Sequence, residues 1–312
     1  KANIHHDSTI NTFILQAEEN EHIRLGGGMS TAENKLNTFK LSYLNEFELS
    51  KLWSIESGIS YNLAKEVKAS DAAALNSAQD KQTFDAQIKA VYSDKYKSLY
   101  ASIAKKSRMP SMVEMFTFFP WDTTNPDLVP EKSIQYTAGY THLINKNSNI
   151  NFSIYYYDIE DLIINRNNSY INRDNANHYG AELRFTTKDF KNHNIAASYA
   201  YSHARDSEGD ALELIPKHQM KIEDSIRLNQ NLQAYIAYQF IVSRFSANTA
   251  TYTDEQLKLS QYGLLEAQVN YKVSDSTSCR VGIKNILDEN YEWKYGYPSE
   301  GRSYYVSLEW EL

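Results

Sequence analysis

The chain has 312 residues, of which 42% are hydrophobic, 13% aromatic and 23% charged, and its formal net charge is −7. An acidic chain gives no reason to expect a nucleic-acid partner, because proteins that bind nucleic acids carry basic patches. No run of about 18 apolar residues occurs, so no transmembrane helix is predicted. The single cysteine, Cys279, cannot form an internal disulfide and is interpreted as a small apolar residue of a strand.

Apolar and polar residues alternate along most of the chain with a period of two, which places the two kinds on opposite faces of β-strands. Two weak runs come first, at residues 10–17 and 22–29, with a turn predicted at 18–21. The pattern predicts about fifteen strands and no amphipathic helix. The stronger runs are residues 37–49, 52–63, 82–92, 97–105, 134–140, 149–156, 179–187, 194–202, 220–228, 232–242, 264–273, 279–286 and 303–312.

The lengths of the runs and of the connections favour a membrane barrel over a soluble sandwich, which alternation alone does not exclude. Many runs reach about 9–11 residues, the length of a tilted membrane-spanning strand, whereas globular strands average about five or six. Short and long connections take turns, as in outer-membrane barrels with short periplasmic turns and long outer loops. By this parity the last strand runs toward the periplasm. The long connections are predicted at residues 30–36, 64–81, 106–132, 165–177, 203–216, 243–258 and 287–302.

Tyrosine and tryptophan gather at the ends of the predicted strands, which is typical of the aromatic girdles of membrane barrels. Aromatic residues at strand ends are also common in soluble β proteins, so this observation supports the membrane interpretation without deciding it. The residues concerned are Trp53, Tyr61, Tyr92, Tyr140, Tyr156, Tyr304 and Trp310.

The connection at residues 107–133 is rich in proline and in large aromatic side chains. It holds four of the six prolines, which exclude a central strand, and its aromatic content argues against disorder. Its sequence reads Arg108-Met109-Pro110-Ser111 and Glu114-Met115-Phe116, then Asn125-Pro126-Asp127-Leu128 and Pro130-Glu131. This order and spacing resembles the barrel signature of TonB-dependent outer-membrane receptors.

The resemblance continues through the second half of the chain. The run from Tyr155 to Ile163 resembles a strand end of the family, and Asn172 with Tyr179-Gly180-Ala181-Glu182-Leu183 resembles the step that follows it. Near the end, Lys284-Asn285-Ile286-Leu287-Asp288 and Tyr291, then Tyr297-Pro298 and Gly301-Arg302-Ser303-Tyr304-Tyr305, resemble the closing motif.

The resemblance implies an all-β fold, an antiparallel transmembrane β-barrel of ~22 strands in the bacterial outer membrane. Receptors of the family also carry an N-terminal plug domain and a segment that engages TonB, and nothing at the start of this chain resembles either. We therefore expect residues 1–312 to be the C-terminal part of the barrel domain, with the plug and the early strands missing.

The function that the resemblance implies is active uptake of a scarce ligand, with TonB as the energy-relaying partner through the missing N-terminal region and outer-membrane lipid around the barrel. A ferric siderophore is the favoured ligand; haem, cobalamin and a passive porin are the alternatives within the membrane, and a soluble interaction domain is the alternative outside it. Haem receptors of the family tend to place a histidine within the opening motif, and residues 116–124 hold none.

Aromatic residues of two outer loops are the candidate ligand contacts, because exposed aromatic rings are costly unless they meet a partner and suit a planar ligand. Arg108 and Arg302 would meet an anionic ligand or structural carboxylates, the latter especially for Arg302. The alternative is that the aromatic rings only pack the loops onto the rim. The candidates are Arg108, Phe116, Phe118, Phe119 and Trp121 in the first loop, and Tyr291, Trp293, Tyr295 and Arg302 in the last.

No motif predicts an enzyme, because the chain has no phosphate-binding glycine loop, nucleophile elbow or H-E-x-x-H pattern. The eight histidines are scattered and only His5 and His6 are adjacent, so neither a metal site nor a cofactor is predicted. The acidic run at residues 206–210 would suit a calcium ion, and a solvated loop is the favoured alternative.

Overall fold

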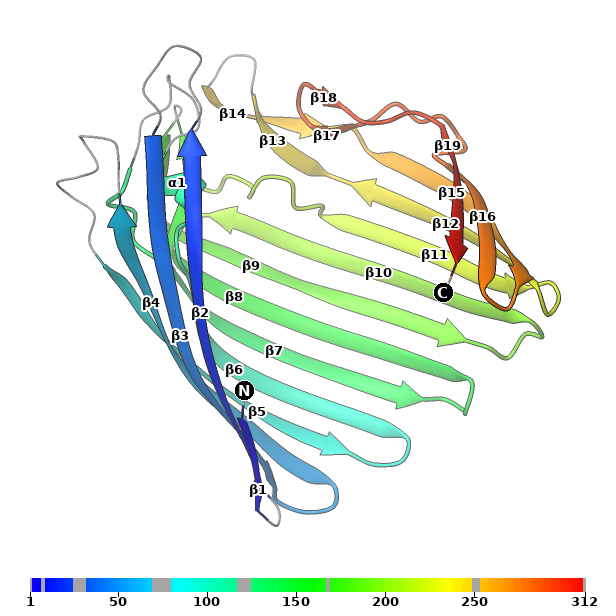
Figure 1. Cartoon of the computed structure of the whole chain (residues 1–312), viewed down its shortest axis with the longest axis horizontal. Coiled ribbons are helices and arrows are strands. Elements are labelled where there is room, and N and C mark those ends of the chain that lie inside the picture. The colour runs from blue at the N-terminus through cyan, green and yellow to red at the C-terminus, as the bar shows by residue number, and fades with distance from the viewer. Residues whose placement is uncertain are drawn as a thin grey trace.

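The computed structural model describes residues 2–6, 9–24, 32–68, 80–116, 125–166, 169–248 and 253–310. One large antiparallel sheet of 15 strands dominates it (Figure 1). Its strands, in sheet order, are β1 (Ala2–His6), β2 (Thr9–Arg24), β3 (Ala32–Glu48), β4 (Trp53–Lys68), β5 (Lys81–Ser93), β6 (Lys97–Arg108), β7 (Glu131–Leu143), β8 (Ser148–Arg166), β9 (Ser169–Thr187), β10 (His193–Asp206), β11 (His218–Arg227), β12 (Leu232–Val242), β15 (Tyr262–Ser274), β16 (Thr277–Lys284) and β19 (Ser303–Trp310).

One short helix and two small hairpins lie in the connections. The short helix α1 (Met112–Met115) follows β6. β13 (Arg244–Asn248) pairs with β14 (Thr253–Leu259), and β17 (Glu292–Lys294) pairs with β18 (Tyr297–Pro298), each as a two-stranded sheet of its own. The sequence pattern predicted none of these elements, because each is too short to show a period.

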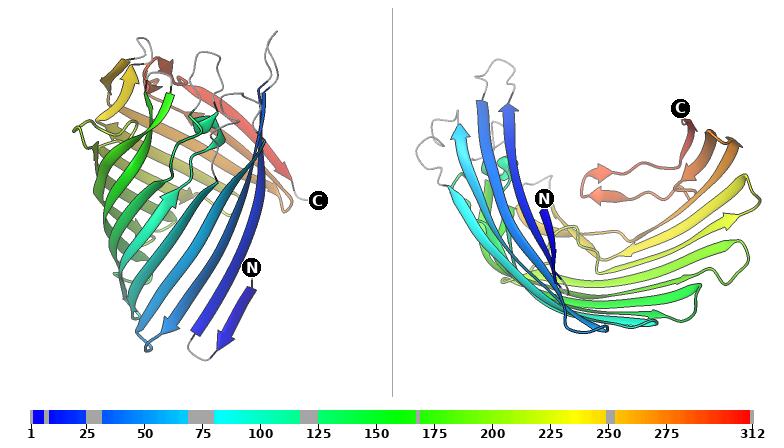
Figure 2. Two further views of the ribbon diagram at one scale, coloured as in Figure 1. Left: turned by 90° about the vertical axis from the view of Figure 1, so that its left-hand side faces the viewer. Right: turned by 60° about the horizontal axis from the view of Figure 1, so that its bottom comes forward.

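The large sheet curls into an open half-barrel (Figure 2). Strands that follow one another in the sheet also follow one another in the chain, except where the two small hairpins stand between β12 and β15 and between β16 and β19. Within the described residues, β1 and β19 are the two edge strands, and they do not pair with each other. The predicted all-β antiparallel barrel wall is confirmed, with the sheet open.

The two faces of the sheet differ in chemistry and in exposure. Along β8, Phe152, Ile154 and Tyr156 are 42 to 47% exposed, while Ser153 and Tyr155 between them are partly buried. Curvature crowds side chains on a concave face and spreads them on a convex one, so the apolar set lies on the convex side. A convex apolar surface suits lipid, and a polar concave face suits the lumen of a barrel.

The long and short connections lie at opposite ends of the sheet (Figure 1), which we call the loop end and the turn end. At the turn end, β3 and β4, β5 and β6, and β7 and β8 are joined by three or four residues. In β19, Trp310 pairs with Thr277 beside the turn that joins β15 and β16. The last strand therefore runs from the loop end to the turn end, in the predicted direction.

The predicted turn at residues 18–21 is wrong. These residues lie inside β2, which pairs with β3 without a break from Thr9 opposite Phe47 to Arg24 opposite Ala32. The run is acidic because this end of the hairpin extends past the lipid-facing belt, where water reaches both faces of the strands. The predicted count of about fifteen strands nevertheless agrees with the large sheet, because β1, which the pattern did not predict, replaces the strand that was split off from β2. The four strands of the two small hairpins were not predicted.

The predicted long loop at residues 165–177 is also wrong, because β8 and β9 stay paired almost to their tip. Asn165 lies opposite Tyr170, and Ile164 lies opposite Ile171. The pairing continues because the tip has a packing partner: Ile163 is buried in a hydrophobic cluster at the loop end, and Tyr170 packs against the same cluster. With 19 residues each, these strands exceed the length needed to cross a membrane.

Aromatic rings form contacts near both ends of the sheet, as expected of a barrel with aromatic girdles. At the turn end, Trp53 lies edge-on to Tyr92, with ring centroids 5.2 Å apart. Nearer the loop end, Tyr136, Tyr156 and Tyr179 form a row across β7, β8 and β9, with neighbouring centroids 6.3 and 6.4 Å apart. Within the described ranges, no helix has the length and the apolar content needed to cross a membrane.

Candidate functional site

The two loops that carry the candidate ligand contacts both lie at the loop end of the sheet (Figure 1). The first, which we call the signature loop, comprises residues 109–130 and joins β6 to β7. The second, which we call the closing loop, comprises residues 285–302 and joins β16 to β19. Each loop begins and ends on neighbouring strands of the wall, so both are anchored at its rim.

An ion triad closes the base of the signature loop. The Arg108 guanidinium donates to Glu114 Oε2 at 2.9 Å and, as a two-pronged fork, to the two carboxylate oxygens of Glu131 at 2.6 and 2.8 Å. Glu131 Oε1 also accepts the backbone N–H of Ile163 at 2.8 Å, which ties β7 to β8. Burial acts to raise the pKa of Glu114, but the hydrogen bonds from Arg108 and Ser111 and the charge of Arg108 together outweigh it and hold that pKa below its ordinary value. Arg108 therefore meets structural carboxylates.

Other polar residues of the signature motif fasten the same loop. Ser111 caps α1 in a capping box, in which its hydroxyl accepts the N–H of Glu114 while Glu114 accepts the N–H of Ser111. Asn125 donates to the Tyr170 carbonyl oxygen at 2.8 Å. Asn172 accepts the N–H of Val129 and donates to the Val129 carbonyl oxygen, both at 2.9 Å. These side chains form hydrogen bonds within the protein. The motif residues therefore serve to fix the conformation of the loop.

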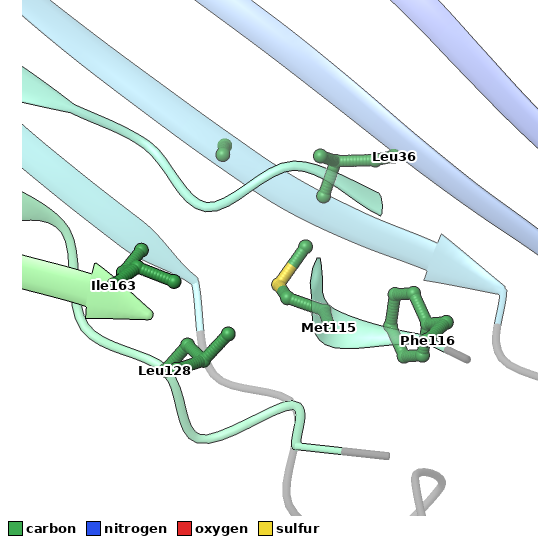
Figure 3. Packing of buried hydrophobic residues seen from close by; sticks show 6 residues of the cluster. Leu36, Met115, Phe116, Leu128 and Ile163 are labelled. Atoms are coloured by element: carbon green, nitrogen blue, oxygen red, sulfur yellow. The ribbon is translucent and has the colours of Figure 1, made fainter. Parts of the chain in front are cut away.

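A small hydrophobic core lies under the signature loop (Figure 3). Phe116 and Leu128 are 2% and 1% exposed. Leu36 of β3 shares the face of that strand that also carries the buried Ser42, so the loop packs on the polar, concave side of the wall. For Phe116 the structure thus shows packing onto the rim. The cluster consists of Leu36, Ala64, Met115, Phe116, Leu128 and Ile163. Three candidates of this loop, Phe118, Phe119 and Trp121, lie outside the described residues.

The closing loop presents its aromatic residues in three ways. The Tyr291 ring lies against Tyr262, with centroids 4.3 Å apart. The backbone N–H of Tyr295 donates to the Ser246 hydroxyl at 3.3 Å. Trp293 keeps 59% of its surface exposed. The structure therefore brings Tyr291, Trp293 and Tyr295 together with β13 and β15, and of these three Trp293 is the large exposed ring.

Side chains at the base of the closing loop bond to nearby backbone. Asn285 accepts the N–H of Glu289 at 2.9 Å and donates to its carbonyl oxygen at 2.9 Å, and Asp288 accepts the N–H of Arg302 at 2.8 Å. Arg302 donates through Nε to the Ile286 carbonyl oxygen at 2.9 Å. The described partner of its guanidinium is thus a backbone carbonyl oxygen, and the Asp288 carboxylate meets Arg302 through the backbone N–H. The guanidinium that is paired with structural carboxylates is that of Arg108.

The acidic run at residues 206–210 meets a cation that belongs to the chain. Arg173 forms an ion pair with Asp206 at 3.1 Å and a second one with Glu208. The other oxygen of Asp206 accepts the N–H groups of Glu208 and Asp210. In the described ranges, no group of three or more histidine, cysteine, aspartate or glutamate side chains has the arrangement of a metal site. The His5 and His6 side chains lie outside the described part.

The model of the family "TonB dependent receptor-like, beta-barrel" matches residues 24–286. The chain belongs to this family. The predicted resemblance is confirmed over most of the length of the chain, and so is the outer-membrane location, because barrels of this family lie in the outer membrane of Gram-negative bacteria. The loop end of this TonB-dependent receptor barrel is the outer side, and the turn end is the periplasmic side.

The names of similar proteins refer to different ligands. A vitamin B12 transporter from Vibrio cholerae is 32% identical over 109 residues, which is 35% of this chain and 18% of the transporter. Among solved structures, a copper transporter, OprC, has a TM-score of 0.81 at 15% identity, covering 99% of this chain and 55% of that one. The ferric-catecholate import receptor Fiu of E. coli has a TM-score of 0.70 at 14% identity, covering 99% and 53%. The chain spans about half the length of these solved structures.

Proposed function

We propose that the full receptor takes up a ferric siderophore across the outer membrane, with energy relayed by TonB. Family membership supports TonB-dependent uptake by a receptor. The observation that supports this ligand class is the exposed Trp293 ring at the outer mouth, with Tyr297, 61% exposed, in the same hairpin. Flat aromatic ligands such as iron-bound catecholates gain about 0.5–1.5 kcal/mol from each ring they stack on. Two similar structures are named for ferric catecholate and ferric enterobactin.

Cobalamin is the second candidate, because the curated relative at 32% identity is a vitamin B12 transporter. Its corrin ring would also be served by exposed aromatic rings. The two ligands differ in charge and size, so a direct comparison of binding separates them.

We expect Trp293→Ala and Trp121→Ala in the full receptor to lower the uptake of radioactive ferric siderophore at limiting concentration by about tenfold, the equivalent of one lost stacking contact. Barrel assembly, followed by the heat-modifiable shift on a gel, is expected to stay normal. Trp53→Phe is the matched control, because Trp53 is also exposed, at 49%, but lies at the periplasmic end. Normal uptake by both alanine variants, or failure that follows only from lost assembly, would contradict the proposal.

A further inference from the structure

Arg244 is among the largest fully buried side chains of the described residues, at 2% exposure, although it lies in an outer connection. Its Nη1 donates to the Trp293 carbonyl oxygen at 3.1 Å, and its Nη2 donates to that of Glu292 at 2.9 Å. The guanidinium carbon lies 4.9 Å from the centroid of the Tyr262 ring and 5.7 Å from that of Trp293. We call Arg244, Tyr262, Glu292 and Trp293 the rim clasp.

The chemistry of the rim clasp is that of a cation that has no counter-ion among the described residues. A guanidinium keeps its charge in proteins, and its burial is costly unless the charge is compensated. In the described part of the chain, the partners of Arg244 are two carbonyl oxygens and two aromatic faces, which attract a cation without carrying a charge. Its Nε atom has no acceptor among the residues that the structure describes. The planar fork of arginine fits two consecutive carbonyl groups, which a lysine cannot match.

A second contact beside the fork joins β13 to the residue that directly follows β17. Ser246, two residues after Arg244, is fully buried and accepts the N–H of Tyr295, two residues after Trp293. The hairpin of β17 and β18 is a marginal structure by itself, because a short two-stranded hairpin has little stability in water. In the right-hand view of Figure 2 this hairpin projects from the end of the sheet into the space of the half-barrel.

We propose that Arg244 is a positioning residue that joins the β13–β14 hairpin to the closing loop and so sets the place of Trp293 at the outer mouth. The proposal rests on the proposed function in so far as Trp293 contacts the ligand. Arg244 itself is buried and does not touch the ligand; it acts through the backbone of Glu292 and Trp293. Its removal is expected to weaken ligand capture and to leave the later steps of transport unchanged.

The test uses, in the full receptor, Arg244→Met, which keeps an unbranched apolar stem and removes the guanidinium. The ferric siderophore concentration that gives half-maximal uptake is expected to rise about tenfold, the equivalent of lost hydrogen bonds to a charged group, with an unchanged maximal rate. Arg244→Lys is expected to give a smaller rise, because one ammonium group keeps the charge and one of the two carbonyl partners. Arg227→Met, at an exposed arginine of the periplasmic end, is the control and is expected to have no effect.

A readout without ligand separates this proposal from the proposed function. Hydrogen exchange at the Tyr295 amide is expected to be about tenfold faster in Arg244→Met than in the wild type. Unchanged exchange in assembled Arg244→Met, or in Arg244→Lys if the methionine variant does not assemble, would overturn the clasp. Faster exchange with unchanged half-maximal uptake would overturn the positioning role. Faster exchange in a receptor whose wild type takes up no ferric siderophore would leave the clasp standing and refute the proposed function.

Discussion

Replacing Phe116 by alanine is expected to make the signature loop open about a hundredfold more often. The ring is 2% exposed in the cluster with Met115 and Leu128, and removing a buried phenylalanine costs about 3 kcal/mol or more. The wall of the barrel is expected to stay intact, because its strands are held by their own ladders and Phe116 contacts them only at the loop end. The variant therefore separates the stability of the loop from that of the sheet.

Hydrogen exchange at the Asn125 amide measures this opening, because that N–H donates to the Met115 carbonyl oxygen at 3.0 Å within the loop. Val113→Ala is the matched control: Val113 lies on the same helix turn and is 45% exposed, so it is expected to change the rate by less than about threefold. Equal exchange rates at Asn125 in Phe116→Ala and in the control would show that the cluster does not hold the loop.

Replacing Arg108 by methionine is expected to destabilise the closed signature loop by about 2 kcal/mol. Glu114 and Glu131 have side chains that are only 15% exposed, and without the guanidinium they would be two largely buried like charges. The estimate is below that for a fully buried pair, because the Arg108 side chain is 45% exposed. The triple variant Arg108→Met, Glu114→Gln, Glu131→Gln is expected to be less destabilised than Arg108→Met, because no unpaired charge is left.

The dependence of loop opening on pH is a further test of the ion triad, because the direction of the change can be predicted. The pKa of Glu114 is lower in the folded loop than in the open one, so the contribution of the triad is complete above the ordinary glutamate pKa of about 4.3 and is lost as the pH falls through the lower, folded value. In Arg108→Met the unpaired carboxylates gain protons more easily, so acid is expected to stabilise the closed loop. Exchange at the Asn125 amide, corrected for its intrinsic rate, should therefore converge between the two proteins below about pH 4. A difference that widens on acidification would contradict the ion-triad account.

The strands of the wall could be predicted from the sequence because every lipid-facing position must be apolar and every lumen-facing position is free to be polar. That constraint ends where the lipid ends. Both errors, at residues 18–21 and 165–177, lie beyond the lipid. There the strands continue in water and are held by strand pairing and by packing at the hairpin tip. A charged run such as Glu18-Glu19-Asn20-Glu21 then has the composition of a turn although it is a strand.

The sequence was enough to locate the candidate site but not to show what its residues contact. The signature motif marked the correct loop, yet the roles of Arg108 and Phe116 depend on partners far away in the chain, Glu131 and the cluster that includes Leu36. Arg244 was missed altogether, because a single arginine after a strand carries no pattern, and its partners stand 18 residues or more along the chain, in β15 and β17. No local signal in the sequence would have identified it.

The most direct test of the proposed function is equilibrium binding of two ligands to the purified full receptor in detergent. Binding is measured by the quenching of tryptophan fluorescence. We expect saturable binding of a ferric catecholate siderophore, with an affinity about tenfold lower in Trp293→Ala. We expect no binding of cyanocobalamin over the same concentration range. Saturable binding of cyanocobalamin with no response to the ferric siderophore would contradict the proposed function and would assign the barrel to the cobalamin receptors.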